Sequence, residues 1–311
     1  MKAFVLTVFA LSFAAGCANA NAAGEATMTA VVNANNTKVT WLDLPQQDLV
    51  YLQLNEGVVV LQLADQFAPR HSERFRQLVN AGFYDGLTFY RVIDQYVLQA
   101  GLPEGETHPS GKPQQWPALK AEFSWPVRKQ DPYFFIEKND VYARETGFNQ
   151  GFPVGREGDE EWLLNCANMI SMARDPAPDT GTTDFAIMQG QAPRHLDRNM
   201  SMFARVIYGG QWLNLMPRGE RDVDYGVIPA HKPRGVIVKA TMGNALPKDK
   251  QLPLQIMNTN SAEFADKVAK HRARDSEFFH YKGLKKVDIC YQQVPVRVVA
   301  APTTPANTVT K

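Results

Sequence analysis

The sequence predicts a mainly β protein, built as a closed barrel or a sandwich rather than from alternating strands and helices. Most of its apolar runs are short, and only two or three segments show the period of a helix. The chain has 311 residues, of which 44% are apolar, so it can fill a sizeable core. No internal repeat and no convincing domain boundary is found. We therefore expect one domain over residues 41–299.

The first expected elements are a β-hairpin and a helix. Residues 49–64 contain two apolar runs separated by Asn-Glu-Gly, which is typical of a hairpin turn. The hydrophobic period then changes, since Phe75, Leu78 and Val79 fall on one helical face. A proline near the start and a glycine at the end predict a helix over 69–81.

Strand patterns return in four later stretches, which are rich in apolar and β-branched residues. These stretches are residues 87–101, 168–173, 184–188 and 201–207. A loop rich in Pro, Gly and Thr separates the second stretch from the third. Residues 211–216 can form a short helix, which the following proline would end.

Two long segments interrupt this pattern and are expected to be loop-rich insertions. Residues 102–165 are rich in Pro, Gly, Trp and charge, and residues 218–260 are irregular apart from an expected strand, GVIVKA. A further helix is expected over 261–274, because Asn and Ser precede it and its last turn is basic. The segment KKVDICYQQVPV, at 285–296, is expected to end the domain as a strand.

The N-terminal residues 1–20 have the layout of a secretory signal. One lysine is followed by an apolar run of about a dozen residues and then by small residues. The run is too short for a comfortable membrane span. Cleavage after Ala20 or Ala22 would release a soluble chain. Alternatively, Ala-Ala-Gly-Cys at 14–17 resembles a lipoprotein processing box, which would leave a lipid anchor on Cys17.

Two segments of low complexity flank the expected domain. Residues 21–40 are rich in Ala, Asn and Thr without hydrophobic period, which predicts a flexible linker. Residues 300–311 have a similar composition and are expected to be a disordered tail. Neither segment is expected to contribute to the core.

Removal of the signal would leave two cysteines in the domain, Cys166 and Cys290. In an oxidising compartment, two buried thiols that meet would form a disulfide. That bond would close a loop of about 120 residues, with a chain-entropy effect of about 4 kcal/mol. The alternative is two separate buried cysteines, because sequence cannot show that they meet.

Charge and motif patterns exclude several classes of function. The chain has 33 Lys and Arg against 32 Asp and Glu, and no basic run stands out, so neither nucleic acid nor an electrostatic membrane patch is expected. Its histidines and cysteines lack metal-ligand spacing, so no metal site is expected. No nucleophile elbow, phosphate loop or dinucleotide glycine motif is present, so no covalent catalysis and no cofactor are expected.

Two long stretches resemble one known family. The stretch GVVVLQLADQFAPRHSERFRQLVNAGFYDGLTFYRVIDQYVLQAG is similar to the first half of a cyclophilin, the β-barrel family of peptidyl-prolyl cis/trans isomerases. ISMARDPAPDTGTTDFAIMQGQAPRHLDRNMSMFARVIYGG is similar to the second half, and the two occur in the family's order. PRHLDRN, the two cysteines and the KKVDICYQQVPVR ending further resemble a larger, exported bacterial branch. The resemblance implies a closed eight-stranded antiparallel barrel.

The resemblance also implies roles for individual residues. Arg91 matches the family's catalytic arginine, and Gln99 matches the glutamine that supports it and contacts substrate. Tyr96 and Val97 match the aromatic residue and the methionine of the proline pocket. Two further matches are an alanine whose backbone lies along the peptide and a pocket leucine, here Ala173 and Leu196.

Five positions depart from the family's pattern. Asp184 stands where the family has a substrate-contacting Gln, Ala186 where it has a pocket Phe, and Met200 where it has a pocket His. Arg174 replaces an Asn whose backbone contacts peptide, and His195 stands at the Trp position linked to cyclosporin binding. Loss of the Phe ring removes up to about 2 kcal/mol of apolar contact, which the flexible Met side chain can partly replace.

Isomerisation of an Xaa-Pro bond requires twisting an amide over a barrier of about 20 kcal/mol, and no bond is made or cleaved. An apolar pocket for the proline ring, with a fixed guanidinium that favours a pyramidal prolyl nitrogen, would stabilise the twisted amide more than the planar one. We therefore expect an isomerase that acts on proline-containing, unfolded or partly folded polypeptides. Its expected location is the periplasm, either soluble or lipid-anchored.

Two alternatives remain open at this point. Asp184 can pair with Arg91 or Arg174, and a pair with Arg91 would compete with substrate for its donors. The chain would then be a catalytically weak or inactive peptide-binding module of the cell envelope. In the second alternative, the insertion at 102–165 covers the site and serves assembly with another envelope protein.

Overall fold

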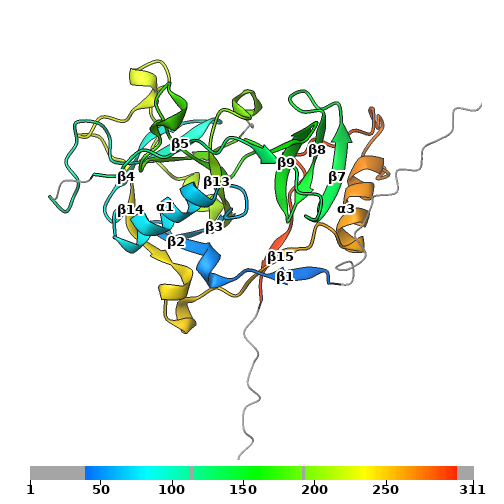
Figure 1. Ribbon diagram of the computed structural model, residues 1–311, viewed down its shortest axis with the longest axis horizontal. Helices are drawn as coiled ribbons and strands as arrows, with labels where there is room; N and C mark the ends of the chain where they lie inside the picture. Colours follow the sequence, from blue (N-terminus) through cyan, green and yellow to red (C-terminus); the bar gives the residue numbers. More distant parts are fainter. Residues whose placement is uncertain (1–38, 112–114, 191–192, 300–311) are drawn as a thin grey trace, which may run out of the picture. The chain divides into compact units, whose positions relative to one another are not determined.

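The computed structural model describes residues 39–111, 115–190 and 193–299 (Figure 1). The predicted secretory signal with Cys17, nearly all of the predicted linker 21–40 and the predicted tail 300–311 lie outside the described residues. Within the described ranges, no helix is long and apolar enough to cross a membrane.

Eight antiparallel strands close into a barrel, and this confirms the predicted architecture. In order around the barrel they are β11 (Met169–Met172), β12 (Phe185–Met188), β5 (Val97–Gly101), β4 (Thr88–Ile93), β14 (Gly235–Met242), β2 (Leu49–Leu54), β3 (Val58–Leu63) and β13 (Met202–Tyr208). Closure pairs every strand on both sides, so the barrel has no free sheet edge and forms a rigid support.

Helix α1 (Pro69–Asn80) packs beside the barrel (Figure 1). Its Phe75 ring lies 5.0 Å from the ring of Phe203 and 5.3 Å from that of Phe185, so α1 joins the barrel core. The proline at its first position fits a helix start, because that backbone N–H would lack a helical partner anyway. The predicted helix 69–81 is therefore right within one residue.

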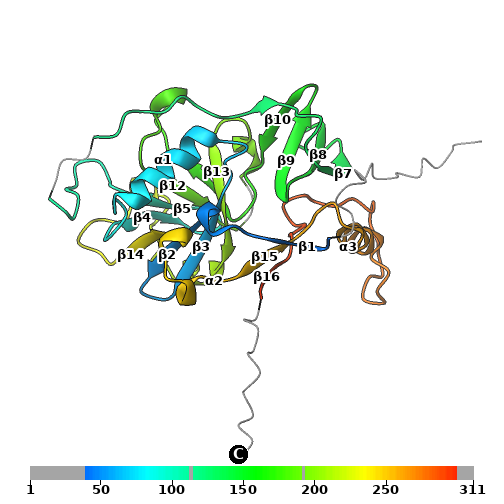
Figure 2. The ribbon, with the colours of Figure 1, turned by 60° about the horizontal axis from the view of Figure 1, so that its bottom comes forward.

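The insertion 102–165 differs from its sequence prediction. The described residues between 102 and 124 form no helix or extended strand, but the rest forms a five-stranded antiparallel sheet (Figure 2). The order is β6 (Trp125–Pro126), β10 (Glu160–Leu163), β9 (Phe152–Glu157), β8 (Glu145–Asn149) and β7 (Tyr133–Lys138). Strand β7 has aromatic residues on both faces, and the first four residues of β9 are all buried, so neither strand shows the apolar and polar alternation that predicts a half-buried strand.

Helix α3 (Ala262–Ala273) covers this second sheet, and it matches the predicted helix 261–274 closely. Ser261 caps its first turn by accepting a hydrogen bond from the backbone N–H of Phe264 at 3.2 Å. The Phe264 ring packs edge-on against Phe134 and Phe148, with ring centroids 5.2 and 5.5 Å away. The sheet and α3 therefore share a small aromatic core.

The segment 218–260 is not a simple insertion. Its expected strand GVIVKA lies in β14, which completes the barrel between β4 and β2. Further along, β15 (Leu254–Met257) pairs with β1 (Trp41–Asp43) and β16 (Val296–Val298) in a three-stranded sheet. This small sheet joins three segments that are far apart in the sequence, and no local pattern predicted β15.

The predicted strand at 285–296 is wrong except for its last residue. The chain turns at Asp288, whose backbone carbonyl accepts hydrogen bonds from the N–H groups of Tyr291 and Gln292. Val287 and Ile289 still face inward, so their alternation reflects burial without a strand partner. The remaining short helices are α2 (Gly210–Leu213), η1 (Gln46–Asp48), η2 (Pro178–Thr180), η3 (Arg194–Leu196), η4 (Asp224–Gly226), η5 (Gly243–Ala245) and η6 (Lys248–Lys250).

Candidate active site

Cross-strand register places the predicted catalytic pair on the outside of the barrel. Arg91 on β4 lies opposite Gln99 on β5, and Gln99 lies opposite Ala186 on β12. The next residues along these strands point inward, because side chains alternate along a strand. They belong to the barrel core, as Val92, Leu98 and Ile187. We call the outer surface of β4, β5 and β12 around Arg91 the Arg91 face.

Neutral oxygens hold the Arg91 side chain. Its Nη1 donates to the Gln99 side-chain oxygen at 3.3 Å, and its Nε donates to the backbone carbonyl of Tyr225 at 2.8 Å. Among the described residues, no carboxylate lies within ion-pair distance of the guanidinium. The group therefore keeps its charge and several N–H donors available for a ligand.

A bulge in β4 builds a hydrogen-bond relay behind Arg91. The register shifts between Phe89 and Arg91, which makes Tyr90 an extra residue on this strand. The Tyr90 hydroxyl accepts from Gln99 Nε2 at 2.5 Å and donates to Asp184 Oδ2 at 2.8 Å. The relay thus runs from Asp184 through Tyr90 and Gln99 to Arg91.

Asp184 pairs with neither Arg91 nor Arg174, the two arginines that the sequence left open as partners. Its Oδ1 accepts from the Leu102 backbone N–H at 3.1 Å and from the Thr183 hydroxyl at 3.0 Å, while its Oδ2 binds Tyr90. Burial raises the pKa of Asp184, although these hydrogen bonds oppose the rise. Burial, reinforced by the nearby carboxylate, also raises the pKa of Tyr90, so the phenol stays a protonated donor.

The predicted pocket residues lie around the same face. The Tyr96 ring centroid is 6.0 Å from the guanidinium carbon of Arg91 and 5.9 Å from that of Arg221. Val97 and Ala186 are buried in β5 and β12, only 4% and 5% exposed. The Ala173 backbone N–H donates to the Asp184 carbonyl at 2.7 Å, which fixes the end of β11 beside β12.

Three further predicted residues come from loops at the end of β11 and between β12 and β13. Leu196 lies in η3 and Met200 just before β13, and both are half-buried. Arg174 donates from Nε and Nη2 to the Asn199 carbonyl at 3.0 and 2.9 Å, which ties the end of β11 to the segment containing Met200. His195 is exposed.

Sequence reasoning missed the segment that borders Arg91 on the other side. Residues 219–228 run along β4, where Gly219 N–H donates to the Val92 carbonyl at 2.7 Å and Ile228 N–H to the Tyr90 carbonyl at 2.8 Å. Gly226 has a positive φ of 83°, and a Cβ there would lie 2.5 Å from the Ile93 side chain. That glycine was the only local signal of this close approach.

A hollow of about 610 Å³ lies next to the relay. Leu102 and Thr183, which both donate to Asp184, contribute to its wall together with Trp116 and Phe83. The hollow therefore lies beside the groups that hold Asp184.

The barrel, its outward arginine and the supporting glutamine define the class of protein. The family model described as "Cyclophilin type peptidyl-prolyl cis-trans isomerase/CLD" matches residues 49–240, more than half of the chain. The chain belongs to this family. The match runs from the start of β2 to within two residues of the end of β14, and so it includes nearly the whole barrel and the Arg91 face.

Individual relatives agree with this assignment. The chain is 27% identical to peptidyl-prolyl isomerase cwc-27 of Neurospora crassa over 175 residues, which are 56% of this chain and 30% of that protein. It is 45% identical to peptidyl-prolyl cis-trans isomerase B of Bacillus subtilis over 56 residues, 18% of this chain and 39% of that protein. The chain thus spans about a third of the length of these curated relatives.

A solved structure extends the similarity beyond the barrel. Cyclophilin AquaCyp293 from Hirschia baltica is 26% identical to the chain and superposes with a TM-score of 0.66. The match covers 83% of this chain and 93% of that one. A coverage of 83% exceeds the stretch matched by the family model, so the similarity includes segments outside the barrel.

Proposed function

We propose that the chain is a peptidyl-prolyl cis/trans isomerase that assists the folding of exported proteins. The supporting observation is that the neutral oxygens of Gln99 and Tyr225 hold Arg91, and that no carboxylate of residues 39–111, 115–190 and 193–299 pairs with it. A guanidinium locked in an ion pair would have to break that pair before it could bind a substrate. Here its orientation is fixed while its charge is free for the reaction.

The proposed mechanism is differential binding of the twisted amide. The proline ring rests against the apolar side chains around Val97 and Ala186, and Arg91 donates to the prolyl nitrogen as its lone pair localises. Gln99 holds the guanidinium on one side and the Tyr225 carbonyl holds it on the other, so little reorganisation is needed during the step. No bond is cleaved and no cofactor takes part.

An exported location fits the covalent structure of the domain. Cys166 and Cys290 form a disulfide, and structural disulfides persist in oxidising compartments such as the bacterial periplasm. The predicted secretory signal at residues 1–20 agrees with this proposal. The chain would work there as a soluble protein or through a lipid on Cys17.

A second candidate function is a binding module with weak or no catalysis. It is favoured by Ala186, where the resemblance implies a phenylalanine ring against the proline. Loss of that ring costs up to about 2 kcal/mol of apolar contact. This candidate predicts that a proline peptide shifts NMR signals of the Arg91 face without broadening from cis/trans exchange.

The deciding experiment measures cis/trans exchange of a proline tetrapeptide with wild type and Arg91→Ala. We expect acceleration by wild type and a fall of about 100-fold in kcat/KM for the variant, because one preorganised donor to the developing charge is lost. Arg70→Ala, an exposed arginine on α1, is the matched control and should retain the wild-type rate. Equal exchange with and without wild-type protein would refute catalysis and leave the binding module.

A further inference from the structure

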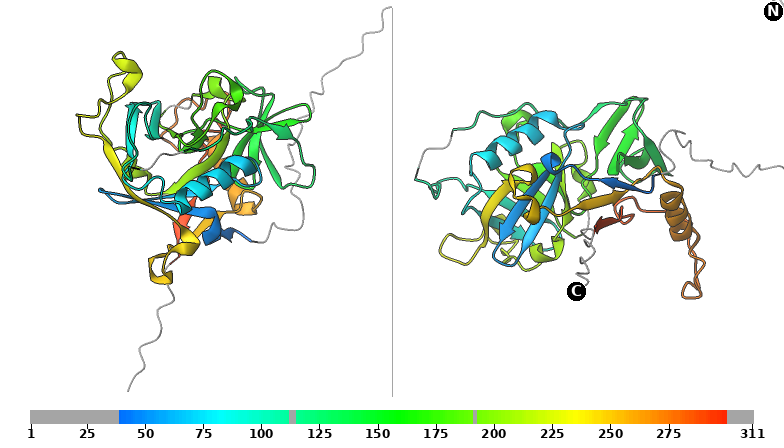
Figure 3. Two further views of the ribbon diagram at one scale, coloured as in Figure 1. Left: turned by 60° about the vertical axis from the view of Figure 1, so that its left-hand side comes forward. Right: turned by 90° about the horizontal axis from the view of Figure 1, so that it is seen from below.

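Residues 275–286 form a loop with unusually exposed apolar side chains. Phe278, Tyr281 and Leu284 are 82%, 83% and 85% exposed, and all three lie within seven residues. Phe279 is 40% exposed, and its ring packs edge-on against Phe278 with the centroids 5.4 Å apart. In Figure 3 the loop reaches outward beyond the end of α3. Large apolar side chains gathered this way are typical of a contact surface.

Hydrogen bonds donated by the Arg274 side chain give the 275–286 loop its shape. Arg274 ends α3 in the left-handed conformation, and its Nη1 and Nη2 donate to the carbonyls of Lys282 and Lys286 at 2.8 and 3.2 Å. Lys282 also pairs with Asp275 at 3.0 Å across the base of the loop. These contacts hold the two ends of the loop together.

The loop lies in a basic part of the chain. Residues 274–286 contain four Lys and Arg against two acidic residues, a formal net charge of +2. The preceding Lys270 and Arg272 pair with Asp266 and Glu137 and add no free charge. Lys285 and Lys286 are exposed and make no ion pair with a described carboxylate. The balance of charges over the whole chain, a formal net charge of +1, conceals this excess.

We propose that the 275–286 loop inserts into the surface of a lipid bilayer that contains anionic lipids. A projecting loop that carries aromatic and Leu side chains matches a bilayer interface, where rings and Leu bury and lysines meet headgroup phosphates. A groove would instead be expected for binding an extended peptide. The net charge of +2 over residues 274–286, with Lys285 and Lys286 exposed, favours an anionic surface over a neutral one.

Vesicle co-sedimentation tests the proposal. The full chain carries Cys17→Ser in every sample, so that no N-terminal lipid contributes, and the vesicles are phosphatidylcholine with or without phosphatidylglycerol. Lys285→Gln with Lys286→Gln should weaken binding to the anionic vesicles about 30-fold, since each basic residue contributes about 1 kcal/mol there. Phe278→Ser should weaken binding to both kinds of vesicle about tenfold. These side chains are exposed, so the variants should unfold at the wild-type urea midpoint.

Val141→Ser is the matched control, because Val141 is 86% exposed but lies outside the loop. Hydrogen exchange localises the contact, and amides of 276–286 should become protected when anionic vesicles are added. Wild-type levels of vesicle binding in the loop variants, or unchanged exchange in the loop, would overturn the proposal. Isomerase activity on a soluble tetrapeptide should be unaffected by these variants, so failure here is distinct from failure of the proposed function.

Discussion

At the scale of single residues, the candidate site depends on a tyrosine to which the sequence assigned no role. Tyr90 connects a buried carboxylate to the glutamine that holds Arg91. Because Asp184 is occupied by Tyr90, Leu102 and Thr183, it is kept away from the guanidinium. Asp184 therefore supports Gln99 and Arg91 through Tyr90 and does not pair with the guanidinium, where it would compete with a ligand.

We predict that Tyr90→Phe lowers kcat/KM about tenfold in the tetrapeptide assay. The change removes the acceptor of Gln99 Nε2 and one donor to Asp184, about 1 to 2 kcal/mol of positioning. The loss should appear in kcat more than in KM, because Arg91 still donates to the Tyr225 carbonyl and so remains at the site. Tyr208→Phe, a half-exposed tyrosine on β13, is the control, and equal rates for both variants would contradict the relay.

Sequence predicts the proposed catalytic pair but not the residues that surround it. Arg91 and Gln99 occupy a spacing that places them opposite each other on a hairpin, so their position follows from motif and strand pairing together. The role of Tyr90 depends on a register shift, and that of Tyr225 on a distant segment pairing with β4. Neither depends on a local hydrophobic pattern, so neither could be read in advance.

At the scale of elements, Glu122 of the insertion supplies hydrogen-bond acceptors to the start of α1. Glu122 accepts from the first backbone N–H groups of the helix, Arg70 at 3.2 Å and His71 at 3.1 Å, and from His71 Nδ1 at 2.7 Å. A carboxylate at this end satisfies unpaired donors and suits the helix dipole. The insertion is therefore anchored to the barrel through the start of α1.

We predict that Glu122→Gln lowers the free energy of unfolding by about 1 to 2 kcal/mol at pH 7. Burial raises the pKa of Glu122, but the hydrogen bonds from His71 and Arg70 outweigh it and hold the pKa below its usual value. A carboxyl group whose pKa is lower in the folded than in the unfolded chain stabilises the fold at pH values above its unfolded pKa of 4.5. This stabilisation is lost as the pH falls through the lower pKa of the folded state.

Urea unfolding at pH 7 and at pH 3 measures this effect. The difference between wild type and Glu122→Gln should shrink on acidification, because the wild-type carboxylate is then protonated as well. Glu104→Gln is the control, since Glu104 is exposed and makes no contact of this kind. A difference that persists unchanged at pH 3 would contradict the assigned role.

Helices were predicted correctly where the hydrophobic period continues over many residues. A strand was missed where its partner strands lie far away in the sequence. The twelve residues of α1 and of α3 repeat an apolar face, and both were predicted within two residues. Strand β15 has only four residues and pairs with β1 and β16 from opposite ends of the domain. Such pairings follow from tertiary packing, which local propensity does not encode.

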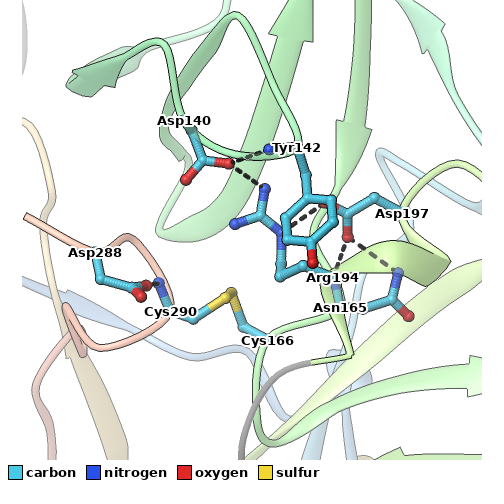
Figure 4. The surroundings of a disulfide bond; sticks show 8 residues. All are labelled: Asp140, Tyr142, Asn165, Cys166, Arg194, Asp197, Asp288 and Cys290. Carbon is cyan, nitrogen blue, oxygen red and sulfur yellow. Dashed lines mark hydrogen bonds and ion pairs between the residues drawn. A yellow bond between two sulfur atoms is a disulfide. The ribbon is translucent and has the colours of Figure 1, made fainter.

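At the scale of the whole domain, one covalent bond joins the barrel side to the C-terminal segment (Figure 4). Cys166 precedes β11, and Cys290 lies in the turn after Asp288, where its N–H donates to Asp288 Oδ1 at 2.8 Å. Next to it, buried Arg194 donates to Asp197 and to Asp140, which links η3 to the loop between β7 and β8. The bond and this network thus fasten the added segments to the β12–β13 region.

Removing the disulfide should lower the free energy of unfolding by about 4 to 5 kcal/mol, because a loop spanning 124 residues gains freedom in the unfolded chain. Urea unfolding of wild type with and without dithiothreitol measures the loss. The double variant Cys166→Ala with Cys290→Ala should unfold at the midpoint of the reduced protein, and dithiothreitol should not change that midpoint. The Arg91 face is positioned by barrel strands that close without Cys290, so the folded double variant should keep the wild-type isomerase rate at low temperature. If reduction left the unfolding midpoint unchanged, the barrel and the C-terminal segment would be held by packing alone, and the bond would be redundant for stability.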